Sequence, residues 1–523
     1  MGRKPITNNE TKDTGNAGLK WAPQALRLLV SCLYSLVSYK IMQTFLFYDI
    51  ETSGLNPAFD QVLTFACIRT DLSLNEIGRE DIVIRLRDDI VPSPGAFLTH
   101  RLDSKILETG ISEYHAALKI HSLLNTPQTI SIGYNSLGFD DEFLRFLFYR
   151  NLLDPYSHQF AKGCGRMDML PVTLIYYLFC HQALSWPVLE NGQSTMRLDL
   201  LTLQNKFKTS GRAHEAMSDV ESVVGLTKRF SNYSRIWSYV QGFFDKNADL
   251  KRMNSLNSSK LASAYGMDLA LMVSVSFGAD CNYMAPVVYV GGSVPYKNQS
   301  LWIRLDKEGL FDQIDETLGI YDLITIRKKP GDQLFILPVL DRFWDKLSPA
   351  SRTVCIRNLD FIKQNMSVFD KTINFHQNFK YPQVPDIDLD ADLYQGGFFS
   401  FQDKKEIAIF HKTEEKKRYQ ITQSFQSNRV RMLAQRILVR NFNENPESAP
   451  EFQAHLKRIL GNDPEKSIKG YKEDEKLTCA KALEALEKIE AEKIQSFDSS
   501  RKDLLTWLKF HIQSQSTFFA DAF

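Results

Sequence analysis

The sequence lacks closely spaced cysteine pairs, a strong net charge and an apolar run long enough to cross a bilayer. Its seven cysteines lie far apart and form no Cys-x-x-Cys motif, which argues against a zinc site or a disulfide framework. The net charge is +1, so any binding of nucleic acid must use a local basic groove. The scattered cysteines favour the reducing cytoplasm, and we expect no association with a membrane.

Residues 1–41 differ in composition from the rest of the chain. Residues 1–24 are polar and rich in glycine, asparagine and threonine, which is typical of disorder. Residues 25–39 are apolar but include Arg27, and this run is shorter than the roughly 20 residues that a membrane-spanning helix needs. The run could be a signal-like segment, but no clear cleavage site follows it. We therefore expect residues 1–41 to be a dispensable extension and Met42 to open the functional protein.

The rest of the chain divides into three regions by its pattern of apolar residues. Residues 42–230 predict strands at 44–51, 61–71 and 81–87, followed by alternating helices and strands, which is typical of an α/β layered domain. Residues 235–383 contain short β-like runs separated by glycine and proline, so a β-rich second domain is expected. Residues 385–523 are highly charged and predict a third, helical domain.

Two carboxylates end the first predicted strand. Asp49 and Glu51 follow the apolar run Thr44-Phe45-Leu46-Phe47-Tyr48, whose two faces are both apolar, as in a central strand. Side chains two residues apart on a strand point the same way, so the two acids lie side by side. Two neighbouring anions at the end of a buried strand repel each other and lose hydration, which is costly unless a cation lies between them.

Further acids and one histidine are expected to join this pair. Asp140 and Asp141 fall at a strand-to-helix junction, and His214 lies five residues before Asp219 near the start of a helix. Four carboxylates are hard oxygen ligands that suit Mg²⁺ or Mn²⁺. Two such ions stabilise the attacking and leaving oxygens at phosphorus, and His214 would take a proton from the attacking water. Asp141 could instead be an acid that favours the helix start.

The order of these motifs resembles a known family. Asp-x-Glu, Asn-x-x-x-Phe-Asp and His-x-x-x-x-Asp form the pattern of the DEDDh 3′–5′ exonucleases, which have a ribonuclease H-like fold. The stretches "FLFYDIETSGLNPAFDQVLTFACIRTD" and "GYNSLGFDDEFLRFLFYRNLLDPY" resemble the nuclease domain of bacterial exodeoxyribonuclease I. The stretch "VSFGADCNYMAPVVY" resembles its SH3-like domain, and "DLYQGGFFS" and "RILVRNF" resemble its C-terminal helical domain. The resemblance implies these three domains at 42–230, 235–383 and 385–523.

The resemblance also implies roles for individual acids. Asp49, Glu51 and Asp219 become direct ligands of the metal, and Asp140 holds a second metal partly through water. His214 becomes the general base. Glu51 also lies close to the terminal nucleotide in this family. The Phe-Asp spacing of the family pattern favours Asp140 over its neighbour Asp141.

Three further positions are implied to contact the substrate. Arg197 falls at a position that contacts DNA in the family, and Arg145 and Tyr156 match positions that line the substrate channel. From the residues alone, Arg197 could be a plain surface charge. Tyr156 and Phe160 could equally be core aromatics or platforms on which bases stack.

The function implied is a Mg²⁺-dependent 3′–5′ exodeoxyribonuclease, with Mn²⁺ able to substitute, that degrades single-stranded DNA to 5′-mononucleotides. The resemblance further implies a role in DNA repair and recombination, docking of the acidic tail of single-strand-binding protein, and a monomer. The acids alone do not separate this from an exoribonuclease or a proofreading exonuclease, because sugar choice depends on contacts around the 2′ position. A catalytically silent single-strand-binding scaffold is a further alternative, although all five motif residues are present.

We predict that a chain starting at Met42 is soluble and fully active. The first predicted strand begins within three residues of Met42, so the shortened chain keeps every predicted element. Exonuclease activity and cell fractionation of the full-length and shortened proteins check this. A shortened chain that fails to fold, or that changes compartment, would show that residues 1–41 have a role.

Overall fold

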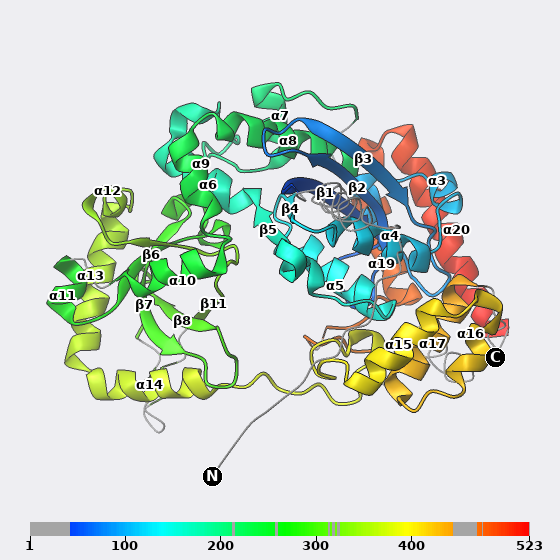
Figure 1. The fold of residues 1–523 in the computed structure, drawn as a ribbon. Helices are drawn as coiled ribbons and strands as arrows, with labels where there is room; N and C mark the ends of the chain where they lie inside the picture. Colours follow the sequence, from blue (N-terminus) through cyan, green and yellow to red (C-terminus); the bar gives the residue numbers. More distant parts are fainter. Residues whose placement is uncertain are drawn as a thin grey trace, which may run out of the picture. The chain divides into compact units, whose positions relative to one another are not determined.

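The fold is built around a five-stranded sheet whose middle strand carries the acidic pair (Figure 1). A computed structural model describes residues 42–211, 215–256, 260–311, 314–315, 320–321, 325–442, 468–472 and 474–521. The strand order is β3-β2-β1-β4-β5, with bounds β1 (Thr44–Thr52), β2 (Val62–Thr70), β3 (Glu76–Val83), β4 (Thr129–Gly133) and β5 (Gly165–Asp168). The first three strands pair antiparallel, whereas β4 runs parallel to β1 and β5. The expected antiparallel start of the sheet is therefore confirmed.

Helices cover both faces of this sheet. On one face, Leu46, Tyr48 and Ile50 of β1 pack with the apolar sides of α4 (Glu113–Leu124) and α5 (Asp140–Arg150). On the other face, Phe45 and Phe47 pack with α6 (Met169–Phe179) and α8 (Ala216–Ser231). This confirms the prediction of a central strand buried on two sides within an α/β layered fold. The other described α-helices between residues 42 and 241 are α2 (Pro94–His100), α3 (Ser104–Glu108), α7 (Leu198–Asn205) and α9 (Ser234–Gln241).

Two strands of the sheet depart from the sequence-based expectation. The predicted third strand at 81–87 is found earlier, at Glu76–Val83. Most of β3 is exposed, because it lies at the edge of the sheet, so its sequence shows little apolar periodicity. β5 has four residues and was not predicted, because it runs directly into the apolar α6 and reads as part of that helix.

The middle region forms a second five-stranded sheet, drawn in green in Figure 1, with the order β11-β8-β7-β6-β12. Its strands are β6 (Leu269–Val273), β7 (Met284–Gly292), β8 (Ser300–Arg304), β11 (Thr325–Lys328) and β12 (Phe335–Pro338), and β9 (Ile314–Asp315) pairs separately with β10 (Ile320–Tyr321). The helices of this region are α10 (Lys246–Asn254), α11 (Lys260–Tyr265), α12 (Asp341–Trp344), α13 (Pro349–Gln364) and α14 (Met366–Asn378). The expected β-rich region is present; its likeness to an SH3 fold and the predicted domain boundaries stay predictions.

The C-terminal region is helical, as expected, and packs on the first sheet's helices. Its described helices are α15 (Phe401–Lys412), α16 (Glu415–Thr422), α17 (Asn428–Asn441), α19 (Cys479–Lys493) and α20 (Ser499–Asp521). Leu433, Ile437 and Leu508 share one core cluster with Phe97 and Phe146. Early and late parts of the chain therefore bury a common apolar core. None of the described helices combines the length and apolar character that a membrane span requires.

A buried network of charges joins the C-terminal helices to the first region. Arg440 of α17 binds Asp89 at 2.8 Å and Asp390 at 2.6 Å, and all three side chains are at most 4% exposed. Arg87 binds Asp89 and also Glu113 of α4, at 2.8 and 2.7 Å. Removing one member would leave an opposite charge buried without compensation, so the network fixes how these segments pack.

We predict that Arg440→Ala lowers the free energy of unfolding by about 3–5 kcal/mol, because Asp89 and Asp390 would remain buried with less compensation. Arg352→Ala is the matched control, since its pair with Asp345 is largely exposed, and a change within about 0.5 kcal/mol is expected there. Urea unfolding followed by circular dichroism measures both. Equal effects of the two substitutions would contradict the structural role of the network.

Candidate metal centre

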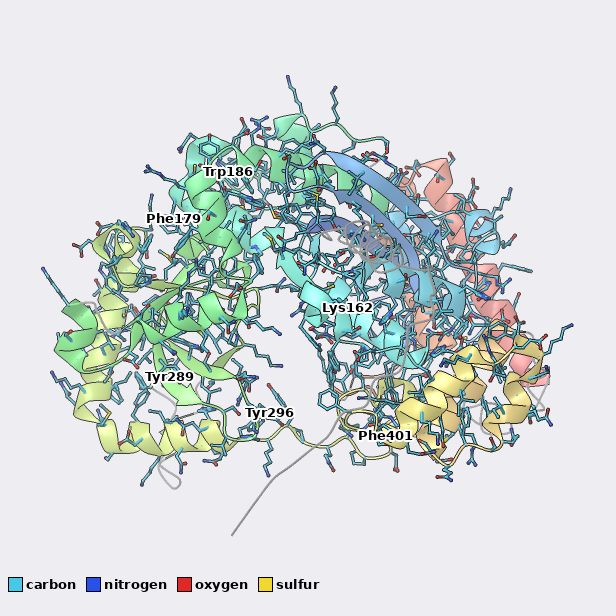
Figure 2. All side chains as sticks on the ribbon, in the orientation of Figure 1. Lys162, Phe179, Trp186, Tyr289, Tyr296 and Phe401 are labelled. Atoms are coloured by element: carbon cyan, nitrogen blue, oxygen red, sulfur yellow. The ribbon has the colours of Figure 1, made fainter. Side chains whose placement is uncertain are left out.

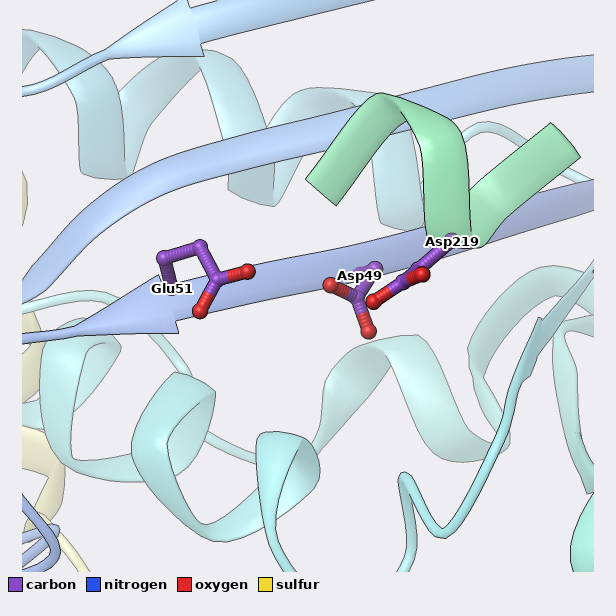
Figure 3. A group of neighbouring side chains, drawn as sticks. All are labelled: Asp49, Glu51 and Asp219. Carbon is purple, nitrogen blue, oxygen red and sulfur yellow. The ribbon is translucent and has the colours of Figure 1, made fainter. Parts of the chain in front are cut away.

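The acidic pair lies side by side on the middle strand. Asp49 and Glu51 both belong to β1, two residues apart, so their side chains leave the same face of the sheet. Asp219 reaches the same place from the first turn of α8, which packs across β1 and β2. One carboxylate oxygen of each of the three residues lies within 4.8 Å of the others (Figure 3). The strand and the helix thus bring together three of the predicted acids.

The fourth predicted acid, Asp140, reaches the same strand from a different helix, α5. It is the first residue of α5 and is only 5% exposed. Its carboxylate accepts a hydrogen bond from the backbone amide of Ile50, the residue between Asp49 and Glu51. Asp140 is not one of the three acids whose oxygens converge within 4.8 Å. Its position beside the pair fits the less direct role that the sequence predicts for it.

Burial and the charges of nearby acids raise the pKa values of three of these acids. Burial and the charges of Asp140, Glu51 and Asp219 hold the pKa of Asp49 well above its ordinary value. Burial and the charges of Asp219 and Asp140 raise the pKa of Glu51 to about 9. Burial, together with nearby acids such as Asp168, raises the pKa of Asp140 to about 7. Such a cluster of hard oxygen ligands fits Mg²⁺ or Mn²⁺, whose charge would offset the repulsion.

Asp141 differs from its neighbour Asp140 in every contact. Its carboxylate binds Arg145 at 2.6 Å and His158 at 3.1 Å, and it also binds Arg166. Although burial opposes it, the guanidinium groups of Arg166 and Arg145 hold the pKa of Asp141 well below its usual range. Asp141 is therefore an internal ion-pair partner that anchors the start of α5, and its carboxylate is already engaged by cations.

His214, predicted to be the general base, lies outside the described residues, as do Arg212 and Ala213. The chain is described again from Glu215, whose carbonyl accepts a hydrogen bond from the amide of Asp219 at 3.1 Å. The assignment of His214 stays a prediction from the sequence.

The three predicted substrate contacts have different surroundings. Arg145 is mostly buried and binds Asp141 and Glu142, and its guanidinium lies 5.8 Å from the ring centre of Tyr156. Tyr156 is half-buried and meets the exposed ring of Phe398, with ring centres 6.0 Å apart. Arg197 precedes α7, is largely exposed and binds Asp199 at 2.6 Å. The structure thus places Arg145 and Tyr156 together and Arg197 apart from them.

One buried acid in this region was missed by sequence reasoning. Asp168 ends β5, caps α6 and accepts hydrogen bonds from the amides of Asn135 and Leu137, in the loop that leads to Asp140. An aspartate directly before an apolar helical run is a signal for a helix cap, and it could have drawn attention to this residue.

Comparison with known proteins identifies relatives of both ends of the chain. Residues 46–227 match a family model described as Exonuclease, and residues 387–514 match one described as Exonuclease I C-terminal domain. Exodeoxyribonuclease I of Escherichia coli strain K12 is 30% identical over 429 residues, covering 77% of this chain and 86% of that protein.

Solved structures of E. coli exonuclease I share the fold. The structure in complex with a dA16 oligonucleotide is 25% identical and has a TM-score of 0.76, covering 91% of this chain and 100% of the other. A structure of SSB/Exonuclease I in complex with the inhibitor CFAM is also 25% identical, with a TM-score of 0.74 and the same coverage. The predicted combination of an α/β exonuclease region with a helical C-terminal region is confirmed by these likenesses.

We predict that the metal-free protein loses stability as the pH rises from about 4.5 to about 9. Over this window Glu51 keeps its proton in the folded state, because its pKa is raised from 4.5 to about 9, whereas the unfolded chain releases it. The unfolded state then binds fewer protons, so the free energy of unfolding falls with rising pH. Glu51→Gln should flatten this fall, because glutamine does not ionise. Thermal unfolding of both proteins in EDTA across this pH range provides the measurement.

Asp141→Asn is the contrasting variant for this prediction. This substitution removes the buried carboxylate that pairs with Arg145 and Arg166. The free energy of unfolding at neutral pH should therefore drop by on the order of 3 kcal/mol. If Glu51→Gln destabilised the metal-free protein as much as Asp141→Asn does, the acids of the cluster would not be in mutual repulsion.

Proposed function

We propose that this chain, which belongs to the exodeoxyribonuclease I family and is a nuclease, removes nucleotides from the 3′ end of single-stranded DNA. The observation that carries the proposal is the convergence of Asp49, Glu51 and Asp219 at the middle strand of an exonuclease fold. The E. coli relative of known structure was solved in complex with an oligonucleotide of deoxyadenosine, which supports DNA as the substrate. The products would be 5′-mononucleotides.

Two Mg²⁺ ions are the cofactor that we propose, with Mn²⁺ able to replace them. Asp49, Glu51 and Asp219 would bind directly, and Asp140 would hold the second ion partly through water. The bound ions supply charge compensation for the attacking and the leaving oxygen at phosphorus. The raised pKa values of the acids support this assignment, because a cation at the cluster would restore their charged forms.

His214 and Glu51 are the residues to which we assign the remaining chemistry. His214 would accept the proton of the attacking water, for which its imidazole must be neutral. Glu51 would also lie beside the terminal nucleotide, as the family resemblance implies. Asp140, buried at the start of α5, would keep its carboxylate directed at the strand through the amide of Ile50.

We propose that the rest of the DNA strand follows a path along aromatic and basic side chains. The ring of Tyr156 contacts the guanidinium of Arg145 and the ring of Phe398, which is 86% exposed. Phe401, labelled in Figure 2, lies at the start of α15 and is 88% exposed. Exposed aromatic rings stack on bases of any sequence, and arginine attracts the phosphates. Arg197, which is exposed beside α7, would contact the DNA separately.

We further propose the cellular setting that the family suggests. The chain would act in repair and recombination in the cytoplasm, as a monomer. A structure of SSB together with exonuclease I among the relatives supports docking of the acidic tail of single-strand-binding protein.

We predict that the purified protein shortens single-stranded DNA from the 3′ end in Mg²⁺ and that EDTA stops this. Matched DNA and RNA strands, labelled at either end, report polarity and sugar choice in one assay. Alanine substitution of Asp49, Glu51, Asp140 or Asp219 should abolish turnover, because each acid contributes to holding the cations.

Asp71→Ala is the control for the acid variants, since Asp71 sits at the turn after β2 and bonds to Asn75 away from the cluster. It should keep wild-type activity. Preferred cleavage of RNA would replace the substrate assignment with an exoribonuclease, and strand binding without cleavage would indicate a silent scaffold. Near-normal turnover in any of the four acid variants would contradict the two-metal site.

A further inference from the structure

The side chain of Gln333, from a turn of the second sheet, contacts the loop that precedes Asp140. Gln333 lies in the turn between β11 and β12, and its Nε2 donates to Asp168 Oδ2 at 2.6 Å and to Asn135 Oδ1 at 3.2 Å. Asn135 belongs to the loop between β4 and α5, and Asp168 ends β5. A side chain from residue 333 therefore meets two residues of the first sheet's edge that lie far from it in the sequence.

Asp168 links the hydrogen bond from Gln333 to the loop before Asp140. Its carboxylate is buried and accepts the amides of Asn135, Leu137 and Leu170 at 2.9, 3.0 and 2.9 Å. These three donors are backbone amides. Among the described residues, the fourth donor to this carboxylate is the side-chain amide of Gln333. A buried carboxylate that loses a donor loses part of the compensation for its burial, so the contact is energetically significant.

The loop held by Asp168 leads directly to the fourth acid. Asn135 has a left-handed backbone, with φ of 62°, and the amide of Asp141 donates to the carbonyl of Ser136 at 2.8 Å. The turn around residues 135–138 thereby sets where α5 begins, and Asp140 is the first residue of that helix. At Gly138 an added Cβ would lie only 3.0 Å from Gln333 Oε1, so the loop and the glutamine are in close contact.

The turn that carries Gln333 is itself fixed. Lys328, fully buried, binds Asp249 of α10 at 2.8 Å and Asp332 at 3.0 Å. Asp332 in turn accepts the amides of Lys329 and Leu334, at 2.8 and 3.0 Å. Gln333 thus projects from a turn with little freedom to adjust, which is what a side chain needs to hold another element in place.

We propose that Gln333 is a positioning residue through which the second sheet sets the place of Asp140 in the metal centre. The proposal rests on the proposed nuclease function and adds a residue outside the exonuclease motifs. Gln333 acts through Asp168 and the loop 135–138. Because small displacements of a catalytic group carry large kinetic costs, loss of one such contact changes turnover more than binding.

The test uses the full chain with Gln333→Ala. The rate constant kcat on a single-stranded oligonucleotide should fall by about 10- to 100-fold, while KM stays within about twofold, because strand contacts are unchanged. Binding of Mn²⁺ to the metal-free protein, followed by electron paramagnetic resonance, should weaken for the ion that Asp140 helps to hold. Gln333→Glu should be more damaging than Gln333→Ala, because it places a carboxylate against that of Asp168.

Gln377→Ala is the matched control. Its side-chain amide likewise donates a hydrogen bond, to the carbonyl of Val290 at 2.8 Å, but within the second region and away from the acids. It should retain wild-type kcat and Mn²⁺ binding. Wild-type kcat and Mn²⁺ binding in Gln333→Ala, or equal losses in Gln377→Ala, would overturn the positioning role while leaving the nuclease function intact. A wild-type protein that neither binds Mn²⁺ nor degrades DNA would instead overturn the proposed function and the inference with it.

Discussion

Repulsion among closely spaced, at least partly buried carboxylates is the constraint on which the site depends. Asp49, Glu51 and Asp219 converge from a strand and a helix, and Asp140 faces the same strand from a second helix. Without a cation between them or a fold that holds them together, four such acids would move apart or take up protons. The packing of β1 between two helical layers prevents the first outcome, so the second follows in the absence of a cation. The free energy stored in this way favours binding of divalent ions.

The second sheet and the C-terminal region each contact a loop next to the acidic residues. Gln333, from the second sheet's turn, reaches the loop before Asp140. From the C-terminal region, Asp474 accepts a hydrogen bond from Asn56, five residues after Glu51. Lys476 also donates to the carbonyl of Asp89 at 2.9 Å. The loop before Asp140 and the loop after Glu51 are thus each held by a residue that lies outside the exonuclease motifs.

The sequence predicts those parts of the site that depend on local pattern. The side-by-side acids of β1 follow from strand periodicity, and Asp219 follows from its place in the first turn of a helix. The contacts of Asp141 with Arg166 and His158 do not follow from local pattern, because both partners are distant in the sequence. The role proposed for Gln333 is likewise invisible, since a polar residue in a turn has no local signature. The edge strand β3 lies earlier than its predicted range, and the short β5 was not predicted, because neither shows the periodicity of a half-buried strand.

The packing of α20 against α2 affects the order in which the chain can complete its fold. Trp507 lies against Phe97, with ring centres 5.7 Å apart, and Leu508 belongs to the same core cluster. A ribosome delivers the chain from its N-terminus, so Phe97 stays uncovered until the last helix has emerged. Asp89 meets Arg440 and Lys476 only late in synthesis for the same reason. A chain truncated before α20 would therefore leave Phe97 without its contact with Trp507 and would expose part of this apolar core cluster.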